Sequence, residues 1–214
     1  MLEVNRGPRR HPVTAPAKIR HLKITLLGVA PPVRRWIAVR ADDTLFDLYL
    51  TLIGAMGWGD SHLHLFEVGD ETYAAPYPDI EPLGIDERTI TVAEAMPNIG
   101  SKIVWLYDMG DNWDHEIELM DIHETQPDVT YPHVEGGKRA CPPEDCGGYY
   151  GYMEILRTLA DPEYENPEYI EREELLGWIP LDFEPDHFDR TEAQEYVNEI
   201  LSLDYWRPIL DALS

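Results

Sequence analysis

Residues 22–56 read LKITLLGVAPPVRRWIAVRADDTLFDLYLTLIGAM, and this stretch decides the fold. Apolar and polar side chains alternate over residues 22–26, which predicts a strand with one face toward water. Residues 36–40 predict a second strand, and two consecutive prolines between the strands force a turn. The segment therefore begins with a hairpin whose loop is residues 28–33.

A helix follows this hairpin. Its apolar side chains recur three and four residues apart and form one stripe: Leu45, Leu48, Tyr49, Leu52, Ile53 and Met56. Thr44 and Asp47 have the spacing of an N-terminal capping box with Asp in place of Glu, and Gly57 supplies a stop. We expect this helix to pack across a sheet.

The middle of the chain predicts more strands. Leu63 and Leu65 alternate with His62 and His64, so both histidines are expected on one strand face. Residues 73–82 predict a Pro-rich and Asp-rich spacer, and residues 91–96 predict a short helix.

A second hairpin is predicted around Gly110. Residues 103–107 alternate large apolar side chains on both faces, which is typical of a strand buried on both sides. In residues 113–119, Trp113 and His115 fall on the apolar face, while the acidic side chains between them fall on the wet face.

The last third predicts helices: one over residues 152–159, one that starts at Asn166 and ends at Gly177, and a long one capped by Asp189 or Thr191. This order of elements predicts an α+β fold with a mixed or antiparallel sheet and additional C-terminal helices. We expect a flexible basic arm over residues 1–17, then one domain over residues 18–214 whose helical part is about 150–214.

Charge limits the classes of partner. The net charge is −24, which disfavours general nucleic-acid binding. Residues 1–40 nevertheless hold nine basic side chains and a single acid, Glu3, so weak nucleic-acid contact through the arm stays open beside a solvated or self-docked arm. The sequence lacks a secretory signal and a long apolar run, which predicts a cytoplasmic protein without membrane contact and with reduced thiols.

The turn DMGDNWDH at residues 108–115 is the first candidate site. Asp108, Asp111 and His115 are possible metal ligands or acid–base groups, since hard cations accept carboxylate oxygens and imidazole suits zinc or iron. The structural alternative is that the aspartates hydrogen-bond their own turn and that His115 belongs to the core.

The loop RACPPEDCGGYYGY at residues 139–152 is the second candidate site. Cys141 and Cys146 would need histidine partners such as His133, His123 or His115 to complete a zinc site. A catalytic thiol at Cys141 is another interpretation, and a proline-stiffened loop that leads into a helix is a third. The glycines match no phosphate-binding pattern, and the sequence lacks GxSxG and HExxH motifs.

Five stretches together carry a family resemblance: 24–39, 44–58, KIVWLYDMGDNWDHEIEL at 102–119, RACPPEDCGGYYGYMEIL at 139–156 and FEPDHFDRTEAQ at 183–194. With these motifs the chain resembles the plasmid pRiA4b open-reading-frame-three family over residues 18–201. Members are small bacterial and archaeal proteins, often carried on plasmids and insertion elements, whose biochemical function is not established. The resemblance implies an α+β, roll-like fold in which a sheet wraps a central helix.

Some family members carry a transposon-passenger resolvase label. A serine recombinase needs a nucleophilic serine among arginines and a DNA-binding surface, whereas residues 41–214 hold forty acidic side chains against eight basic ones. The family supplies no catalytic residues that could be assigned here.

Two functions remain as hypotheses. The first is a non-enzymatic, mobile-element accessory protein without a cofactor that binds a protein partner or a small ligand. Its candidate surface comprises Asp108, Asp111, Trp113, His115, Cys141, Glu144, Asp145, Tyr149 and Tyr150. The alternative is a metal-dependent, hydrolase-like enzyme with Asp108, Asp111 and His115 as ligands and Glu144 or Asp145 as base.

Overall fold

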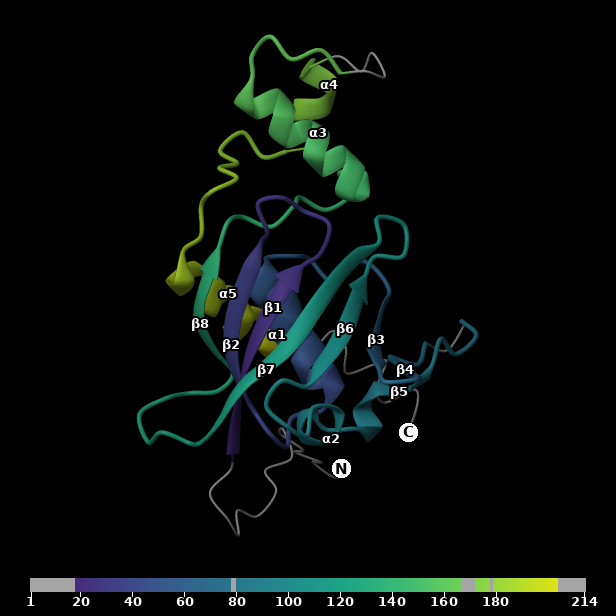
Figure 1. Cartoon of the computed structure of the whole chain (residues 1–214), viewed down its shortest axis with the longest axis vertical. Helices are drawn as coiled ribbons and strands as arrows, with labels where there is room; N and C mark the ends of the chain where they lie inside the picture. The colour runs from purple at the N-terminus through teal and green to yellow at the C-terminus, as the bar shows by residue number, and fades with distance from the viewer. Residues whose placement is uncertain (1–17, 78–79, 167–171, 178, 204–214) are drawn as a thin grey trace, which may run out of the picture.

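A mixed sheet of eight strands organises the described chain (Figure 1). The computed structural model describes residues 18–77, 80–166, 172–177 and 179–203. The strands are β1 (Lys18–Leu26), β2 (Arg34–Arg40), β3 (His64–Val68), β4 (Glu71–Ala74), β5 (Ile85–Asp86), β6 (Lys102–Tyr107), β7 (Trp113–Glu124) and β8 (His133–Lys138). Their order across the sheet is β5-β4-β3-β6-β7-β1-β2-β8, and β4 with β5 is the parallel pair among otherwise antiparallel neighbours. The α+β class and the mixed sheet are confirmed, whereas a roll that wraps a central helix stays a prediction.

The β1–β2 hairpin forms as predicted. Ile24 pairs with Arg35, and the amide of Leu26 donates to the carbonyl of Val33 at 3.1 Å to close the loop. Leu22 and Ile24 are buried on the inner face of β1, because side chains in a strand alternate between its two faces.

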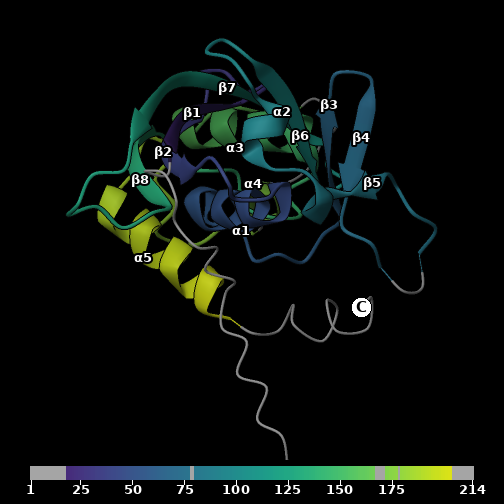
Figure 2. The same ribbon diagram turned by 90° about the horizontal axis from the view of Figure 1, so that it is seen from below.

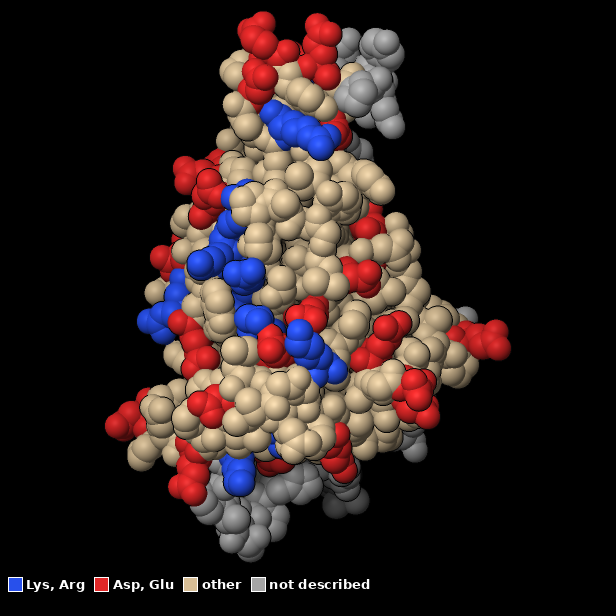
Figure 3. Space-filling model, in the orientation of Figure 1, with Lys and Arg blue, Asp and Glu red and all other residues tan. Residues whose placement is uncertain are grey.

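Basic side chains of this hairpin fold onto the acidic body. Lys23 pairs with Glu118 of β7 on the outer face of the sheet. Arg35 is buried and donates to backbone carbonyls, including that of Ala55 at 2.7 Å. Figure 3 shows Lys and Arg in a band across the sheet with acidic side chains beside them. Residues 1–17, the predicted arm, lie outside the described residues.

Helix α1 (Leu45–Met56) has the predicted limits and caps. The Thr44 hydroxyl accepts from the Asp47 amide at 3.2 Å, and the Asp47 carboxylate accepts from the Thr44 amide at 2.8 Å. Gly57 ends the helix with φ of 90°, the left-handed conformation that glycine adopts without strain. Helix α1 lies between the sheet and α5 (Arg190–Ser202), which explains why its whole apolar stripe is buried (Figure 2).

The β6–β7 hairpin supplies the aromatic part of the core. Trp105 pairs with His115 and Tyr107 pairs with Trp113. The inward position predicted for Trp113 and His115 is confirmed, since both are buried. Burial of β6 on both faces is wrong: its inner face is buried, but Val104 and Leu106 on the outer face are half-exposed.

The strand predicted at residues 63–65 begins at His64, so the two histidines do not share a strand face. His64 and Phe66 are buried, whereas Leu63 and Leu65 are half-exposed. The physical reason is a partner for the histidine: His64 Nε2 lies 2.9 Å from the carboxylate of Glu87, which is also buried. Glu87 comes from the 3-10 turn η1 (Glu87–Thr89). His62 precedes β3 and lies in a loop.

The sequence did not reveal β4, β5 or β8. The sequence of β8, HVEGGK, has two glycines and no alternation of apolar and polar residues. The glycines leave room for aromatic rings that pack against this strand. A Cβ at Gly137 would lie 2.5 Å from the Phe188 ring, and one at Gly136 would contact Trp36. The short helix predicted at residues 91–96 is present as α2 (Val92–Ala95).

The C-terminal third is helical as predicted. Helix α3 (Gly148–Ala160) covers the predicted 152–159 segment, and α4 (Arg172–Leu176) ends at the predicted stop, while residues 167–171 lie outside the described chain. Asp189 rather than Thr191 caps α5. Helices α3 and α4 lie beyond the sheet end that carries the β6–β7 turn (Figure 1). No helix among the described residues has the length and apolarity to cross a bilayer.

Candidate functional site

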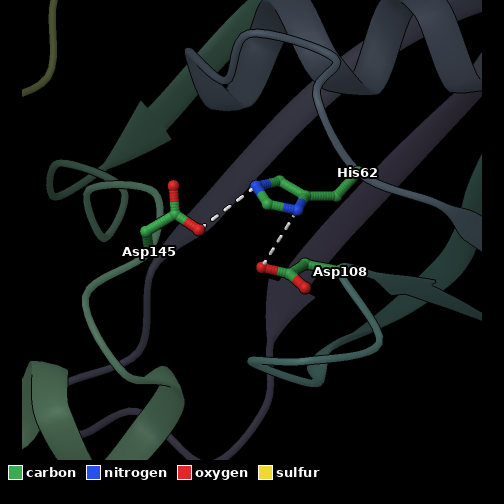
Figure 4. A group of neighbouring side chains, drawn as sticks. All are labelled: His62, Asp108 and Asp145. Carbon is green, nitrogen blue, oxygen red and sulfur yellow. Dashed lines mark ion pairs between the residues drawn. The ribbon is translucent and has the colours of Figure 1, made fainter.

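Three loops far apart in sequence meet beneath the start of α3. They are residues 57–63, 108–112 and 139–147, and we refer to them as the loop cluster. His62 lies between two carboxylates from the other loops: its Nδ1 is 3.6 Å from Asp108 Oδ2, and its Nε2 is 3.5 Å from Asp145 Oδ1 (Figure 4). The predicted hairpin turn and the predicted thiol loop are therefore adjacent.

Asp108 shapes the β6–β7 turn from within. Its φ of 57° lies in the left-handed region, which aspartate tolerates better than most residues. Its Oδ1 accepts from the amide of Gly110 at 2.8 Å and from that of Asp111 at 3.3 Å. This leaves Oδ2 directed toward His62, as Figure 4 shows.

Glu144 joins the loops by accepting from three donors. Its Oε1 accepts from the Tyr107 hydroxyl at 2.7 Å and from the Ser61 hydroxyl at 3.3 Å, and its Oε2 accepts from the amide of Gly59 at 3.1 Å. Burial, and then this bond to Glu144, raise the pKa of Tyr107 well above the ordinary tyrosine value. The carboxylate thus fixes the loops and the end of β6 to one another.

Trp58 fixes the thiol loop to the end of α1. Its indole Nε1 donates to the carbonyl of Pro142 at 2.9 Å, and its ring stacks on Tyr107 with centroids 4.8 Å apart. Asp145, in contrast, projects into solvent from the same loop, with φ of 56°.

Asp111 contacts α3 through its backbone. A Cβ at Gly148 would lie 2.5 Å from the Asp111 carbonyl oxygen, and Gly148 also has φ of 65°, so this close approach requires glycine. The Asp111 side chain buries Oδ2 without a hydrogen bond in the described chain.

An exposed apolar edge lies beside the loop cluster. We define the tyrosine edge as Leu27, Tyr149 and Tyr150. Tyr149 and Tyr150 have ring centroids 5.2 Å apart, and the Tyr149 ring packs over Gly28 of the β1–β2 loop. Tyr150 is 81% exposed although it stands in helix α3.

His115 and Trp113 belong to the core instead. His115 is fully buried, stacks on Trp105, and has Nδ1 3.2 Å from the Trp105 carbonyl. Burial lowers the pKa of His115 to about 3, so the ring is neutral at physiological pH. Trp113 is buried against Trp58 and Tyr152.

The predicted metal ligands Asp108, Asp111 and His115 do not gather around one point. Among the described residues, the group of three possible ligands whose atoms lie within 4.8 Å of one another is His62, Asp108 and Asp145. His62 was missed because alternation around Leu63 placed it in a strand, and nothing local links it to residues 46 and 83 positions away.

The two thiols are neither paired nor activated. Both cysteines are free, and burial raises the pKa of each thiol to about 12. Cys141 Sγ donates to the sulfur of Met56 at 3.5 Å. Since the thiolate is the reactive and metal-binding form, these thiols act as packing groups at neutral pH.

Comparison with known proteins places the chain in a family. Residues 18–192 match the plasmid pRiA4b ORF-3-like protein family. The chain belongs to this family. It is 38% identical over 165 residues to the uncharacterized protein y4hQ of Sinorhizobium fredii (strain NBRC 101917 / NGR234), a match that covers 76% of this chain and 81% of that protein.

A solved structure shares the fold of this pRiA4b ORF-3-like chain. The crystal structure of the protein of unknown function MM3350 from Methanosarcina mazei Go1 is similar with a TM-score of 0.73 and 32% identity. The match covers 82% of this chain and 97% of that one.

Proposed function

We propose that this pRiA4b ORF-3-like protein is a non-enzymatic accessory protein that binds a protein partner through the tyrosine edge and the adjoining loop cluster. The observation that carries the proposal is the exposure of Tyr150 on a helix, with the Tyr149 ring in edge-to-face contact beside it and Leu27 44% exposed. Aromatic side chains are enriched at the centres of protein interfaces because they bury a large area at little entropic cost.

The backbone beneath this surface supports a preformed binding face. Gly28 and Gly148 allow Tyr149 and Asp111 to approach closely, and the Leu27 amide donates to the Asp114 carbonyl at 2.8 Å. A surface that is already ordered loses less conformational entropy when a partner binds.

Charge defines the chemistry of the partner. Asp114 bonds to Leu27 and Asp111 lies against Gly148, next to Tyr149, in a chain with a net charge of −24. A partner with an apolar anchor and flanking Lys or Arg side chains is complementary to this surface. Such a partner would associate faster at low ionic strength than at high.

Site-specific photocrosslinking tests this proposal. A photoreactive phenylalanine analogue replaces Tyr150 in one variant and Ile99 in the control, because Ile99 is 60% exposed before the start of β6, away from the edge. Expressed in the native host, position 150 is expected to crosslink a defined protein that position 99 does not. The purified partner should then bind the Tyr150→Ser variant at least about tenfold more weakly, as expected for an interface hot spot. Identical crosslinks from both positions, or unchanged affinity of Tyr150→Ser, would refute the proposal.

The geometry gives less support to the hydrolase-like alternative than to partner binding. His115 lies in the core, and Glu144, one of the two expected bases, already accepts from three donors. Asp145 remains exposed, but the ligands predicted to hold the cation beside it do not converge.

A further inference from the structure

We propose that His62, Asp108 and Asp145 bind one divalent transition-metal cation, of which zinc is the type. The site joins all three loops of the loop cluster (Figure 4). It uses His62, which the sequence did not single out, in place of Asp111 and His115, and it requires neither an enzymatic reaction nor the partner proposed above.

The separations between ligand atoms suit such an ion. In a tetrahedral site with bonds of about 2.0–2.2 Å, neighbouring ligand atoms lie about 3.3–3.6 Å apart. The separation from His62 Nδ1 to Asp108 is 3.6 Å and that from His62 Nε2 to Asp145 is 3.5 Å, so one of the two describes a pair of ligand atoms. With one atom taken from each residue, all three ligand atoms lie within 4.8 Å of one another. A cation takes a single ring nitrogen, so binding requires a small rotation of the imidazole and of the Asp145 side chain, which is 66% exposed and has room to turn.

A buried ring nitrogen without a hydrogen bond is the second observation. His62 Nε2 is buried and has no hydrogen-bond partner among the described residues, although it lies 3.5 Å from Asp145 Oδ1. Asp108 is 7% exposed; its Oδ1 accepts from two amides, and its Oδ2 lies 3.6 Å from His62 Nδ1. Burying a polar nitrogen without a hydrogen bond is costly, and a cation between the ring and the carboxylates would satisfy it.

The donor set selects the class of ion. Imidazole favours zinc, iron, copper and nickel over calcium and magnesium, and two carboxylates balance a divalent charge. Neither Cys141 nor Cys146 belongs to this group of neighbouring ligand atoms in the described chain. Three protein ligands leave a fourth position open to water. The opposing explanation is that the His62 ring bridges the two carboxylates directly, with no metal.

Calorimetric titration of the full-length chain, freed of metal by chelator and carrying no affinity tag, separates these explanations. The probes are ZnCl₂ and, to avoid thiol binding, MnCl₂. The variants are His62→Gln and Asp145→Asn; Asp145 is chosen because its exposed side chain has the least effect on folding. The matched control is His123→Gln, because His123 pairs with Asp121 at 3.0 Å on an exposed part of β7.

We expect one equivalent of Zn²⁺ to bind wild type and His123→Gln alike, with Mn²⁺ at the same stoichiometry and lower affinity. His62→Gln and Asp145→Asn should weaken Zn²⁺ binding at least about tenfold, because even outer-shell substitutions cost that much. Circular dichroism verifies that each variant is folded. Absence of saturable Zn²⁺ binding to wild type, or equal affinity of wild type and Asp145→Asn, overturns the proposal. The outcome of the crosslinking test at position 150 does not change what is expected in the metal titration. Each proposal can therefore be refuted without affecting the other.

Discussion

A neutral buried histidine makes the stability of this protein depend on pH. Burial against Trp105 and Trp58 lowers the pKa of His115 from 6.5 to about 3. Between these values the unfolded chain binds more protons than the folded chain, so acid favours unfolding. The contribution of His115 to stability is complete above about pH 6.5 and decreases as pH falls toward 3.

His115→Phe tests this dependence. We expect wild type to lose about 3 kcal/mol more than the variant in the free energy of unfolding between pH 7 and pH 4. Urea denaturation at each pH measures the loss, and contributions of other groups cancel in the difference. Ile117→Val, in the same strand and equally buried, is the control for general destabilisation and should keep the wild-type pH dependence. Parallel curves for wild type and His115→Phe would mean that His115 is not held neutral.

For single residues, the sequence predicted the inward position of His115 but did not identify His62 as a candidate site residue. The inward position of His115 follows from strict alternation in WDHEIEL, which is a local signal. His62 and His64 stand in a similar alternation, yet His64 turns inward because Glu87, far along the chain, pairs with it. A buried carboxylate partner allows a polar side chain to occupy the inner face of a strand. The alternation of apolar and polar residues gives no information about such a partner.

Elements with local signals were predictable, and those made by long-range pairing were not. The caps of α1 and α5 depend on residues within three positions of one another. Strand β8 depends instead on β2 and on the Phe188 ring that requires Gly137. The residues of β8 are therefore explained by packing against neighbouring side chains and not by strand propensity.

The contact between α1 and α5 gives a prediction for Gly54→Ala. Alanine favours a helix over glycine by about 1 kcal/mol. A Cβ at position 54 would, however, lie 2.6 Å from the Val197 Cα, which is backbone and cannot rotate away. We expect this overpacking to prevail and to lower the free energy of unfolding by about 1–2 kcal/mol in urea denaturation.

Glu195→Ala, on the exposed face of α5, is the control and should change stability by less than about 0.5 kcal/mol. If Gly54→Ala proved as stable as wild type, the close helix contact would have no energetic role.

The whole molecule brings together what the sequence separates. Residues 62, 108 and 145 become neighbours because β3 and β6 lie side by side, while Trp58 and Glu144 fix the thiol loop to the loop before β3 and to the end of β6. The sequence indicated the turn at 108–112 and the loop at 139–147 as places of chemistry. The place where these two segments meet depends on the order of strands in the sheet, and so does the choice of His62 as the third proposed ligand. No local sequence pattern predicts that strand order.

Net charge acts on the whole molecule, and it predicts the response to salt. Acidic side chains outnumber basic ones by 41 to 17, so folding concentrates negative charge. Salt also weakens pairs such as Lys102–Glu116, but exposed pairs contribute about 0–1 kcal/mol each. We therefore expect screening of repulsion to dominate, and the thermal midpoint to rise by a few degrees, roughly 3–6 °C, when NaCl increases from about 20 to 500 mM at pH 7.5 with chelator present. Choline chloride should give the same rise, because screening does not depend on which cation is used. A midpoint that falls with either salt would mean that ion pairs outweigh repulsion despite the excess of acid.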